Sequence, residues 1–300
     1  MKIAIHGLGR MGMQIAERLT LEGHHVIAHN RSPEPMQTAA SFGAIAATTK
    51  HDVVAAFAGE QPVVWIMLPA DIVEGQLREW LEILPHGSVI VDGGNSDFRN
   101  TAKHAEIVAT SHSEFVDVGT SGGIMGFEHG FSMMVGGSEA GFKTIEPALV
   151  SLSKPQGSYH YFGSHGAGHY VKMVHNAIEY GMMESLAEGY RMLREGAFPD
   201  IDLAAAGDVW QRGSIVNSSL NQLTTQALHE NPKLEGIDGF VAESGEARWT
   251  LEYAAEKGIP LPAIQAAFDV RLASQQGERT FATKLLAAMR NKFGGHDLNK

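Results

Sequence analysis

The segment from Lys172 to Tyr180 carries residue types that could act as a base and an acid. Its polar residues fall at i, i+3, i+4 and i+7, and they are Lys172, His175, Asn176 and Glu179. On an α-helix these positions share one face, and the residues around them are mostly apolar, so the face is expected to be buried. A Lys and a Glu on a buried face cost stability unless they are paired or used. The pattern therefore indicates either a structural ion pair or an acid–base pair working on a bound substrate.

A glycine-rich segment near the N-terminus has the spacing of a dinucleotide-binding loop. The run His6-Gly7-Leu8-Gly9-Arg10-Met11-Gly12 fits G-x-G-x-x-G, follows a strand pattern and opens a helix pattern. Gly7 permits a tight turn, Gly9 lets the backbone approach a pyrophosphate, and Gly12 lets helix and strand pack closely. The expected cofactor contacts in this loop are Gly7, Leu8, Gly9, Arg10, Met11 and Gly12.

The end of the second predicted strand indicates which cofactor is used. A site for NAD normally has Asp or Glu here to hold the ribose 2′-hydroxyl, whereas this chain has Asn30-Arg31-Ser32. Arg31 could bind a 2′-phosphate, and such a charge-assisted contact is worth roughly 1.5–3 kcal/mol. The sequence therefore favours NADP, with NAD still possible and a merely solvated Arg31 as the alternative. Further candidate cofactor contacts are Leu68, Pro69 and Asn95.

Composition excludes several classes of function. The chain has 300 residues, no cysteine and a net charge of −11. The absence of cysteine removes disulfides, thiolate nucleophiles and cysteine-ligated zinc. The negative charge argues against nucleic acid or an anionic membrane as partner. The fifteen His residues show no convincing metal-ligand spacing, so no metal is expected. With no signal peptide or membrane-spanning run, we expect a cytoplasmic protein.

The chain changes character near its middle. Strand patterns alternate with helix patterns in the first half, with strands predicted over 2–6, 25–30, 63–68, 88–92, 114–118 and 132–135. Later segments read as helices only, over 166–195, 203–212, 214–230, 243–257, 263–276 and 280–292. The predicted fold is an α/β Rossmann-type doubly wound sheet, followed by an all-α C-terminal domain. We expect a dinucleotide-binding domain over 1–165 and a helical substrate and dimerisation domain over 166–300.

Small and polar residues follow strands or open a helix at three more places, where ligands meet an open α/β sheet. These are Asp92-Gly93-Gly94-Asn95-Ser96, Thr120-Ser121-Gly122-Gly123 and Gly166-Ala167-Gly168-His169. With the glycine loop, the stripe from Lys172 to Tyr180, Arg248-Trp249-Thr250 and the tail over 290–296, the chain resembles the decarboxylating 6-phosphogluconate dehydrogenases. These belong to the β-hydroxyacid dehydrogenase superfamily, and the short chain resembles their short form.

The resemblance implies oxidative decarboxylation of 6-phosphogluconate to ribulose 5-phosphate and CO2, with NADP or NAD reduced. It implies that Lys172 is the general base and that Glu179 protonates the enediol. A buried Lys can be neutral and a buried Glu can keep its proton, as those roles require. The resemblance places Asn95, Ser121, Gly122, Gly123, His175 and Asn176 on the sugar and carboxylate. It places Tyr180, Arg248, Arg271, Arg290 and His296 on the phosphate.

Two departures and two alternatives accompany this hypothesis. The family often has acidic residues where Ile124 and Met125 stand, and often Lys where Arg248 stands. A homodimer or homotetramer is expected, in which Arg290 and His296 act within one subunit or on a neighbour. One alternative is a 3-hydroxyisobutyrate or tartronate semialdehyde type of dehydrogenase, which usually lacks the His-Asn…Glu array. The other is a non-catalytic NADP-binding sensor, which the intact Lys and Glu argue against.

Overall fold

The computed structural model describes residues 1–298. The chain divides into two compact units, the first ending at Met173 and the second beginning at Val174. Each unit has its own buried apolar clusters. Within the described part of the chain, no helix is both long and apolar enough to cross a membrane.

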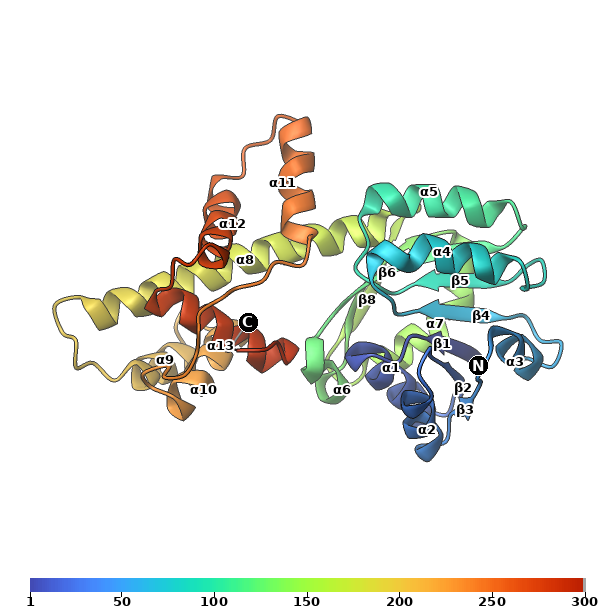
Figure 1. Ribbon diagram of the computed structural model, residues 1–300, viewed down its shortest axis with the longest axis horizontal. Helices are drawn as coiled ribbons and strands as arrows, with labels where there is room; N and C mark the ends of the chain where they lie inside the picture. The colour runs from blue at the N-terminus through green and yellow to red at the C-terminus, as the bar shows by residue number, and fades with distance from the viewer. Residues whose placement is uncertain (299–300) are drawn as a thin grey trace. The chain divides into compact units, whose positions relative to one another are not determined.

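The first unit is built on one eight-stranded sheet in the order β3-β2-β1-β4-β5-β6-β7-β8 (Figure 1). All neighbouring strands are parallel except β6 and β7, which are antiparallel. The strand bounds are β1 Lys2–His6, β2 His25–His29, β3 Ile45–Ala46, β4 Val63–Ile66, β5 Val89–Asp92, β6 Glu114–Ser121, β7 Ser132–Gly137 and β8 Ser158–Gly163. The chain order reverses at β1, which pairs with β2 on one side and β4 on the other. Ligands of open α/β sheets bind at such a reversal.

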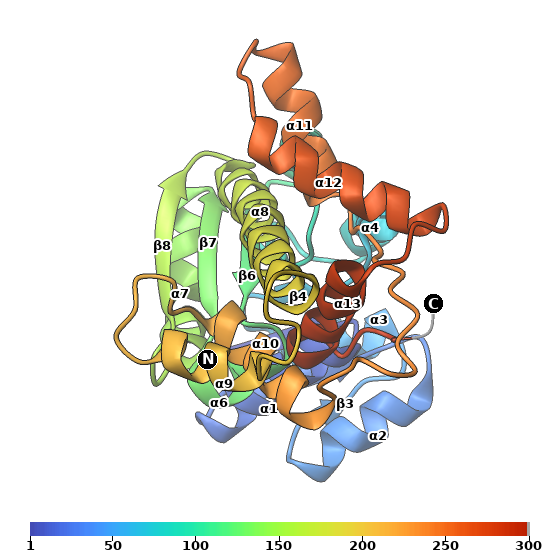
Figure 2. The same cartoon turned by 90° about the vertical axis from the view of Figure 1, so that its left-hand side faces the viewer.

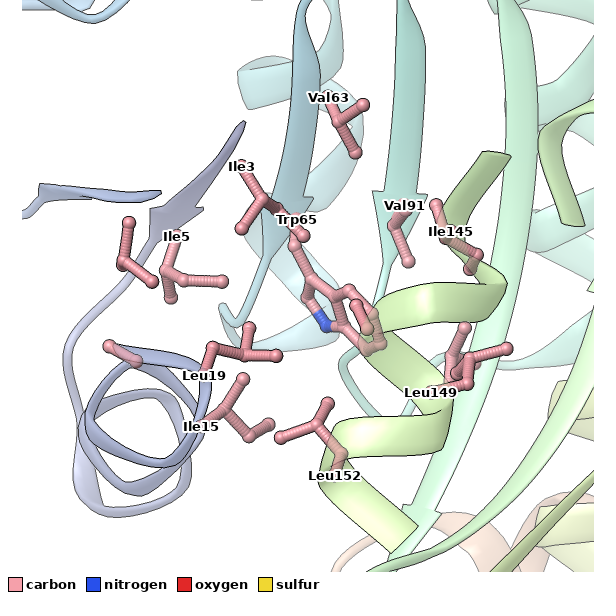
Figure 3. Packing of buried hydrophobic residues seen from close by; sticks show 14 of the residues in the cluster. Ile3, Ile5, Ile15, Leu19, Val63, Trp65, Val91, Ile145, Leu149 and Leu152 are labelled. Carbon is pink, nitrogen blue, oxygen red and sulfur yellow. The ribbon is translucent and has the colours of Figure 1, made fainter. Parts of the chain in front are cut away.

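Helices cover both faces of this sheet. Their bounds are α1 Arg10–Leu21, α2 Pro33–Ser41, α3 Lys50–Ala56, α4 Ala70–Leu81, α5 Phe98–Ala109, α6 Gly126–His129 and α7 Glu139–Ser153, with a 3₁₀ turn η1 at Gly123–Met125. On one face Ile15 of α1 and Leu149 of α7 pack around Trp65, which is fully buried (Figure 3). On the other face α3, α4 and α5 bury Val53, Trp80 and similar side chains. Sheets buried on both faces need apolar strands, and the runs in β1, β4 and β5 meet that need.

The second unit is helical throughout the described residues. Its helices are α9 Leu203–Gln211, α10 Ser219–Glu230, α11 Glu246–Glu256, α12 Pro262–Gln275 and α13 Phe281–Gly294, together with most of α8, Ala167–Glu195. Tyr190 of α8, Leu228 of α10 and Leu285 of α13 are fully buried in one apolar cluster. The helices α11 and α12 lie side by side in both views (Figures 1 and 2).

The predicted fold class is confirmed, while three local predictions are wrong. Strands β3 and β8 were not expected. β3 has only two residues, both exposed, and β8 alternates half-buried aromatic residues with exposed ones at the sheet's edge. β6 runs on to Ser121 rather than stopping at Val118. The helix expected from residue 214 begins at Ser219, because the Ser218 side chain accepts a hydrogen bond from the Asn221 amide and caps α10 there.

Candidate active site

The glycine loop between β1 and α1 has the geometry of a dinucleotide cradle. Gly7 has a φ of +101°, in the region that favours glycine. A Cβ on Gly12 would lie 1.9 Å from the Gly7 carbonyl oxygen, so only glycine lets α1 begin this close to the strand. Gly9 caps the helix, and a Cβ built there would meet nothing within 4 Å. The open helix N-terminus suits a pyrophosphate, with Leu8, Arg10 and Met11 along the same turn.

After β2, Asn30 connects two loops and Arg31 is exposed. The Asn30 side chain accepts from the Leu8 amide at 3.1 Å and donates to the Ser32 carbonyl at 3.3 Å. Asn30 therefore ties the glycine loop to the loop after β2. Arg31 and Ser32 are exposed, and Arg31 makes no ion pair among residues 1–298. Arg31 is thus available for a 2′-phosphate.

The loop after β5 presents Asn95 from a rigid turn. Asp92 is fully buried and accepts from the Gly94 amide at 3.1 Å and from the Ser96 hydroxyl at 2.7 Å. A Cβ on Gly94 would lie 2.8 Å from the carbonyl oxygen of Leu68, the residue before Pro69. The loops after β4 and β5 therefore lie against each other, and Asn95 is exposed between its two fixed neighbours.

The Ser-Gly-Gly turn follows directly from the end of β6. Ser121 is the last residue of the strand and is half-buried. Gly122 and Gly123 have φ values of +130° and +52° before the 3₁₀ turn begins. Both angles favour glycine, so two residues without side chains follow Ser121.

Asp117 fixes the start of helix α8 in the first unit. It is fully buried in β6, and its two carboxylate oxygens accept from the Gly166 amide at 2.8 Å and the His169 amide at 2.9 Å. The His169 ring forms a 2.8 Å hydrogen bond with the Thr101 hydroxyl. A carboxylate at a helix N-terminus satisfies amides that the helix leaves unpaired and favours the helix dipole. The first turn of α8 is therefore held firmly on the sheet.

Lys172 lies one turn further along α8, directly over a glycine. It is 5% exposed, which confirms its expected burial. A Cβ on Gly119 of β6 would lie 2.3 Å from the Lys172 Cβ. A Cβ on Gly168 would lie 2.4 Å from the Met134 carbonyl oxygen. Missing side chains on strand and helix thus let α8 approach the sheet and set where the Lys172 side chain starts.

In the second unit, Asn176 stands at the centre of a hydrogen-bonded group. Its amide nitrogen donates to a carboxylate oxygen of Glu246 at 2.8 Å, and its amide oxygen lies 2.9 Å from the His175 Nδ1. Asn176 is 9% and Glu246 2% exposed, so the hydrogen bond between them is shielded from water, whereas His175 is half-buried. Glu179, one turn after His175, is only half-buried, although its whole helix face was expected to be buried.

Arg271, a predicted phosphate contact, lies against Tyr180 in the second unit. It is 1% exposed, and its guanidinium carbon lies 3.2 Å from the centre of the Tyr180 ring. It also donates to the Ala242 carbonyl at 3.4 Å. Burial lowers the Arg271 pKa to about 10. The Tyr180 hydroxyl accepts from the Ser244 amide at 3.2 Å. The Arg271 guanidinium thus packs on the face of the Tyr180 ring and supports it.

The other predicted phosphate contacts differ in their exposure. Arg248 is exposed on α11 and pairs with Glu243. Arg290 of α13 is 7% exposed, and burial lowers its pKa while the nearby Tyr180 and Glu179 oppose that shift. His296 is half-buried beyond the end of α13, where its carbonyl accepts from the Asn291 side chain at 2.7 Å. Arg290 and Tyr180 are therefore close enough within this unit to interact electrostatically.

Comparisons with known proteins identify the family. The model of the NAD-binding domain of 6-phosphogluconate dehydrogenase matches residues 2–164, and that of the C-terminal domain matches residues 168–300. The chain belongs to the 6-phosphogluconate dehydrogenase family. A Haloferax volcanii relative named as an NAD(+)-dependent, decarboxylating 6-phosphogluconate dehydrogenase is 35% identical over 99% of this chain and 98% of its own.

Solved structures agree with this family fold. The Plasmodium falciparum 6-phosphogluconate dehydrogenase superposes with a TM-score of 0.82 and 25% identity, over 96% of this chain and 70% of its own. A Mycobacterium tuberculosis 3-hydroxyisobutyrate dehydrogenase superposes with a TM-score of 0.73 at 20% identity, over 95% and 97% of the two chains. At that identity the second likeness shows the fold alone.

Three residues of this 6-phosphogluconate dehydrogenase family member were missed from the sequence. Asp117 and Gly119 hold Lys172 in place, and Glu246 holds Asn176. Asp117 had a detectable signal, because a charged residue inside an apolar strand run is rarely there without a partner. Glu246 stands two residues before Arg248, which drew attention instead. Among the described residues, no group of three His, Cys, Asp or Glu side chains could hold a metal ion.

Proposed function

We propose that this protein oxidatively decarboxylates 6-phospho-D-gluconate to D-ribulose 5-phosphate and CO2, with reduction of NADP or NAD. The observation that carries the proposal is Lys172, a buried lysine seated on Gly119 and followed on the same helix by Asn176 and Glu179. The name of the Haloferax volcanii relative, which matches over nearly the whole of both chains, supports the same reaction.

The proposed chemistry assigns one proton transfer to each catalytic residue. Burial disfavours a charged ammonium, so Lys172 acts as the neutral amine and takes the proton of the C3 hydroxyl. When bound, the nicotinamide accepts the hydride from C3. The 3-keto acid then loses CO2, and the electrons of the broken C1–C2 bond pass to the C3 oxygen. Protonated Lys172 donates a hydrogen bond to that oxygen, and Glu179 gives a proton to C2, which becomes C1 of the product.

Substrate binding divides between the hydroxylated chain and the phosphate. For the hydroxyls and carboxylate we propose Asn95, Ser121, Gly122, Gly123, His175 and Asn176. For the phosphate we propose Tyr180, Arg248, Arg271, Arg290 and His296, because guanidinium groups form paired hydrogen bonds with phosphate oxygens. Arg271 also packs on the Tyr180 ring and so supports that neighbouring contact.

For the cofactor we propose a preference for NADP through Arg31. This residue is exposed and lies two positions after β2 ends, where a ribose 2′-substituent would be read. The Haloferax volcanii relative is named as NAD(+)-dependent, so the preference has to be measured on this chain. We also propose a homodimer or homotetramer, because the second unit exposes Met192, Phe198, Val209 and Ile215 at 70% or more.

The experiment is an initial-rate assay with 6-phosphogluconate, run in parallel with NADP and NAD while released CO2 is trapped. Equal amounts of reduced cofactor and CO2 are expected. Lys172→Met should abolish turnover while leaving NADP binding intact. Arg31→Ala should lower kcat/KM with NADP by about ten- to a hundredfold and leave the value with NAD nearly unchanged. No turnover in wild-type protein that still binds a dinucleotide would refute the assignment.

A further inference from the structure

Glu246 is a buried carboxylate for which the proposed reaction has no use. It is the first residue of α11 and is 2% exposed. One carboxylate oxygen accepts from Asn176, and the other is buried without a hydrogen-bond partner among the described residues. Leaving such an oxygen unpaired carries a desolvation cost, of which the helix N-terminus offsets a part. A residue kept at that cost beside proposed substrate contacts is expected to serve the site.

The hydrogen bonds from Glu246 determine where the His175 ring carries its proton. The Asn176 amide nitrogen donates to a Glu246 carboxylate oxygen, so the Asn176 amide oxygen is the atom that faces His175. An amide oxygen only accepts, so the Nδ1 of His175, 2.9 Å away, has to be the N–H donor. In a neutral ring the other nitrogen, Nε2, then carries the lone pair.

We propose that Glu246 is a positioning residue that, through Asn176, fixes His175 as the tautomer with hydrogen on Nδ1. The inference rests on the proposed function, in which His175 contacts the sugar chain. An Nε2 lone pair accepts a hydrogen bond from a substrate hydroxyl. The site thereby selects acids that carry the hydroxyl bound by His175, because an analogue without that hydroxyl leaves the Nε2 lone pair without a hydrogen-bond partner.

The tautomer can be measured without any activity. The full chain is labelled with ¹⁵N-histidine, and long-range ¹H–¹⁵N spectra report which ring nitrogen carries hydrogen, with the His175 signal assigned from its loss in His175→Asn. The Nδ1–H form is expected in the wild type. In Glu246→Gln the new amide can face Asn176 either way, so the Nε2–H form should appear. An Nε2–H ring in the wild type, or no change in Glu246→Gln, would overturn the proposal.

Kinetics test whether Glu246 acts through Asn176. Glu246→Gln should lower kcat/KM for 6-phosphogluconate about tenfold or more, but should add little in an Asn176→Ala background. The matched control is Glu252→Gln, at an exposed position of the same helix, which should change neither rate nor tautomer. An undiminished effect of Glu246→Gln in the Asn176→Ala background would make its role purely structural and refute the proposal.

The two tests distinguish a failure of the proposed function from a failure of the positioning role of Glu246. If the chain does not turn over 6-phosphogluconate but the spectra show the Nδ1–H form and its loss in Glu246→Gln, the proposed function fails and the positioning role stands. If Glu246→Gln does not fold, the wild-type spectrum alone still decides, because an Nε2–H ring there contradicts the chain of hydrogen bonds.

Discussion

Replacing Gly119 by Ala tests whether the glycine under Lys172 determines catalytic geometry. The new Cβ would lie 2.3 Å from the Lys172 Cβ and 2.8 Å from its Cγ, whereas ordinary contact begins at 3.4 Å, so one side must move by about 1 Å. The clash involves the first side-chain atoms of Lys172, which cannot move unless α8 moves. The helix is itself held by the hydrogen bonds of Asp117 to the amides of Gly166 and His169. The strain is therefore expected to displace the amine as well as the strand.

A displacement of about 1 Å at a catalytic group can cost a hundredfold in rate. We expect kcat for 6-phosphogluconate to fall about a hundredfold in Gly119→Ala, with stability reduced by about 1–3 kcal/mol. Cofactor affinity, measured by fluorescence titration, should stay within about twofold, because the glycine loop lies on other strands.

The matched control makes the same substitution where there is room. Gly75 is exposed in α4, and a Cβ there would meet nothing within 4 Å. Gly75→Ala should leave kcat unchanged and raise stability by about 0.5–1 kcal/mol. If Gly119→Ala were folded and kept kcat within about threefold of the wild type, the argument that this glycine sets the position of Lys172 would be wrong.

Two further predictions concern pH and stability. Burial lowers the pKa of His6 to about 3, and its Nδ1 accepts from the Trp80 indole at 3.0 Å. Below pH 6.5 His6 binds a proton in the unfolded chain but stays neutral in the native state, so the free energy of unfolding falls as the pH is lowered. His6→Asn keeps a hydrogen-bond acceptor, and in denaturant titrations it should reduce this loss by about 1.4 kcal/mol per pH unit. The control His51→Asn, at an exposed position, should not. Burial raises the pKa of Glu184 to about 7, so the native state keeps a proton that the unfolded state loses above pH 4.5. The free energy of unfolding should therefore fall by about 3 kcal/mol between pH 4.5 and 7. Glu184→Gln should remove this loss, whereas the control Glu188→Gln should keep most of it. An unchanged slope of unfolding free energy against pH in Glu184→Gln would contradict the assignment.

The sheet was predictable because its strands carry a strong local signal. Runs such as Val63–Ile66 and the first three residues of Val89–Asp92 are apolar on both faces, which is typical of a parallel sheet covered by helices. The glycine loop was predictable for a related reason, because a motif of three glycines between strand and helix has few other uses. Edge strands such as Ser158–Gly163 escape this reasoning, since one side of an edge strand pairs with nothing and its residues can be polar.

Side-chain roles were predictable only where the chemistry needs a particular residue type. Lys172 was found because a lysine on an apolar helix face demands an explanation. The burial of Arg271 was not predictable, because sequence spacing does not tell whether a guanidinium faces solvent or, as here, the ring of Tyr180. Glu246 and Asn176 are 70 residues apart in sequence, and their hydrogen bond depends on how α8 and α11 pack. No local pattern encodes such a contact.

The geometry of helix α8 sets the spacing between Lys172 and Glu179 along the chain. An α-helix rises about 1.5 Å per residue, so the backbones of Lys172 and Glu179 are separated by about 10 Å along one axis. That spacing is a property of a single helix, whose start is held by Asp117 and whose later turns pack in the buried cluster around Tyr190. Seven residues are close to two turns, so the side chains of the proposed base and acid leave the helix on the same face. A reaction that needs one proton removed and another delivered on the same substrate can use two groups arranged in this way.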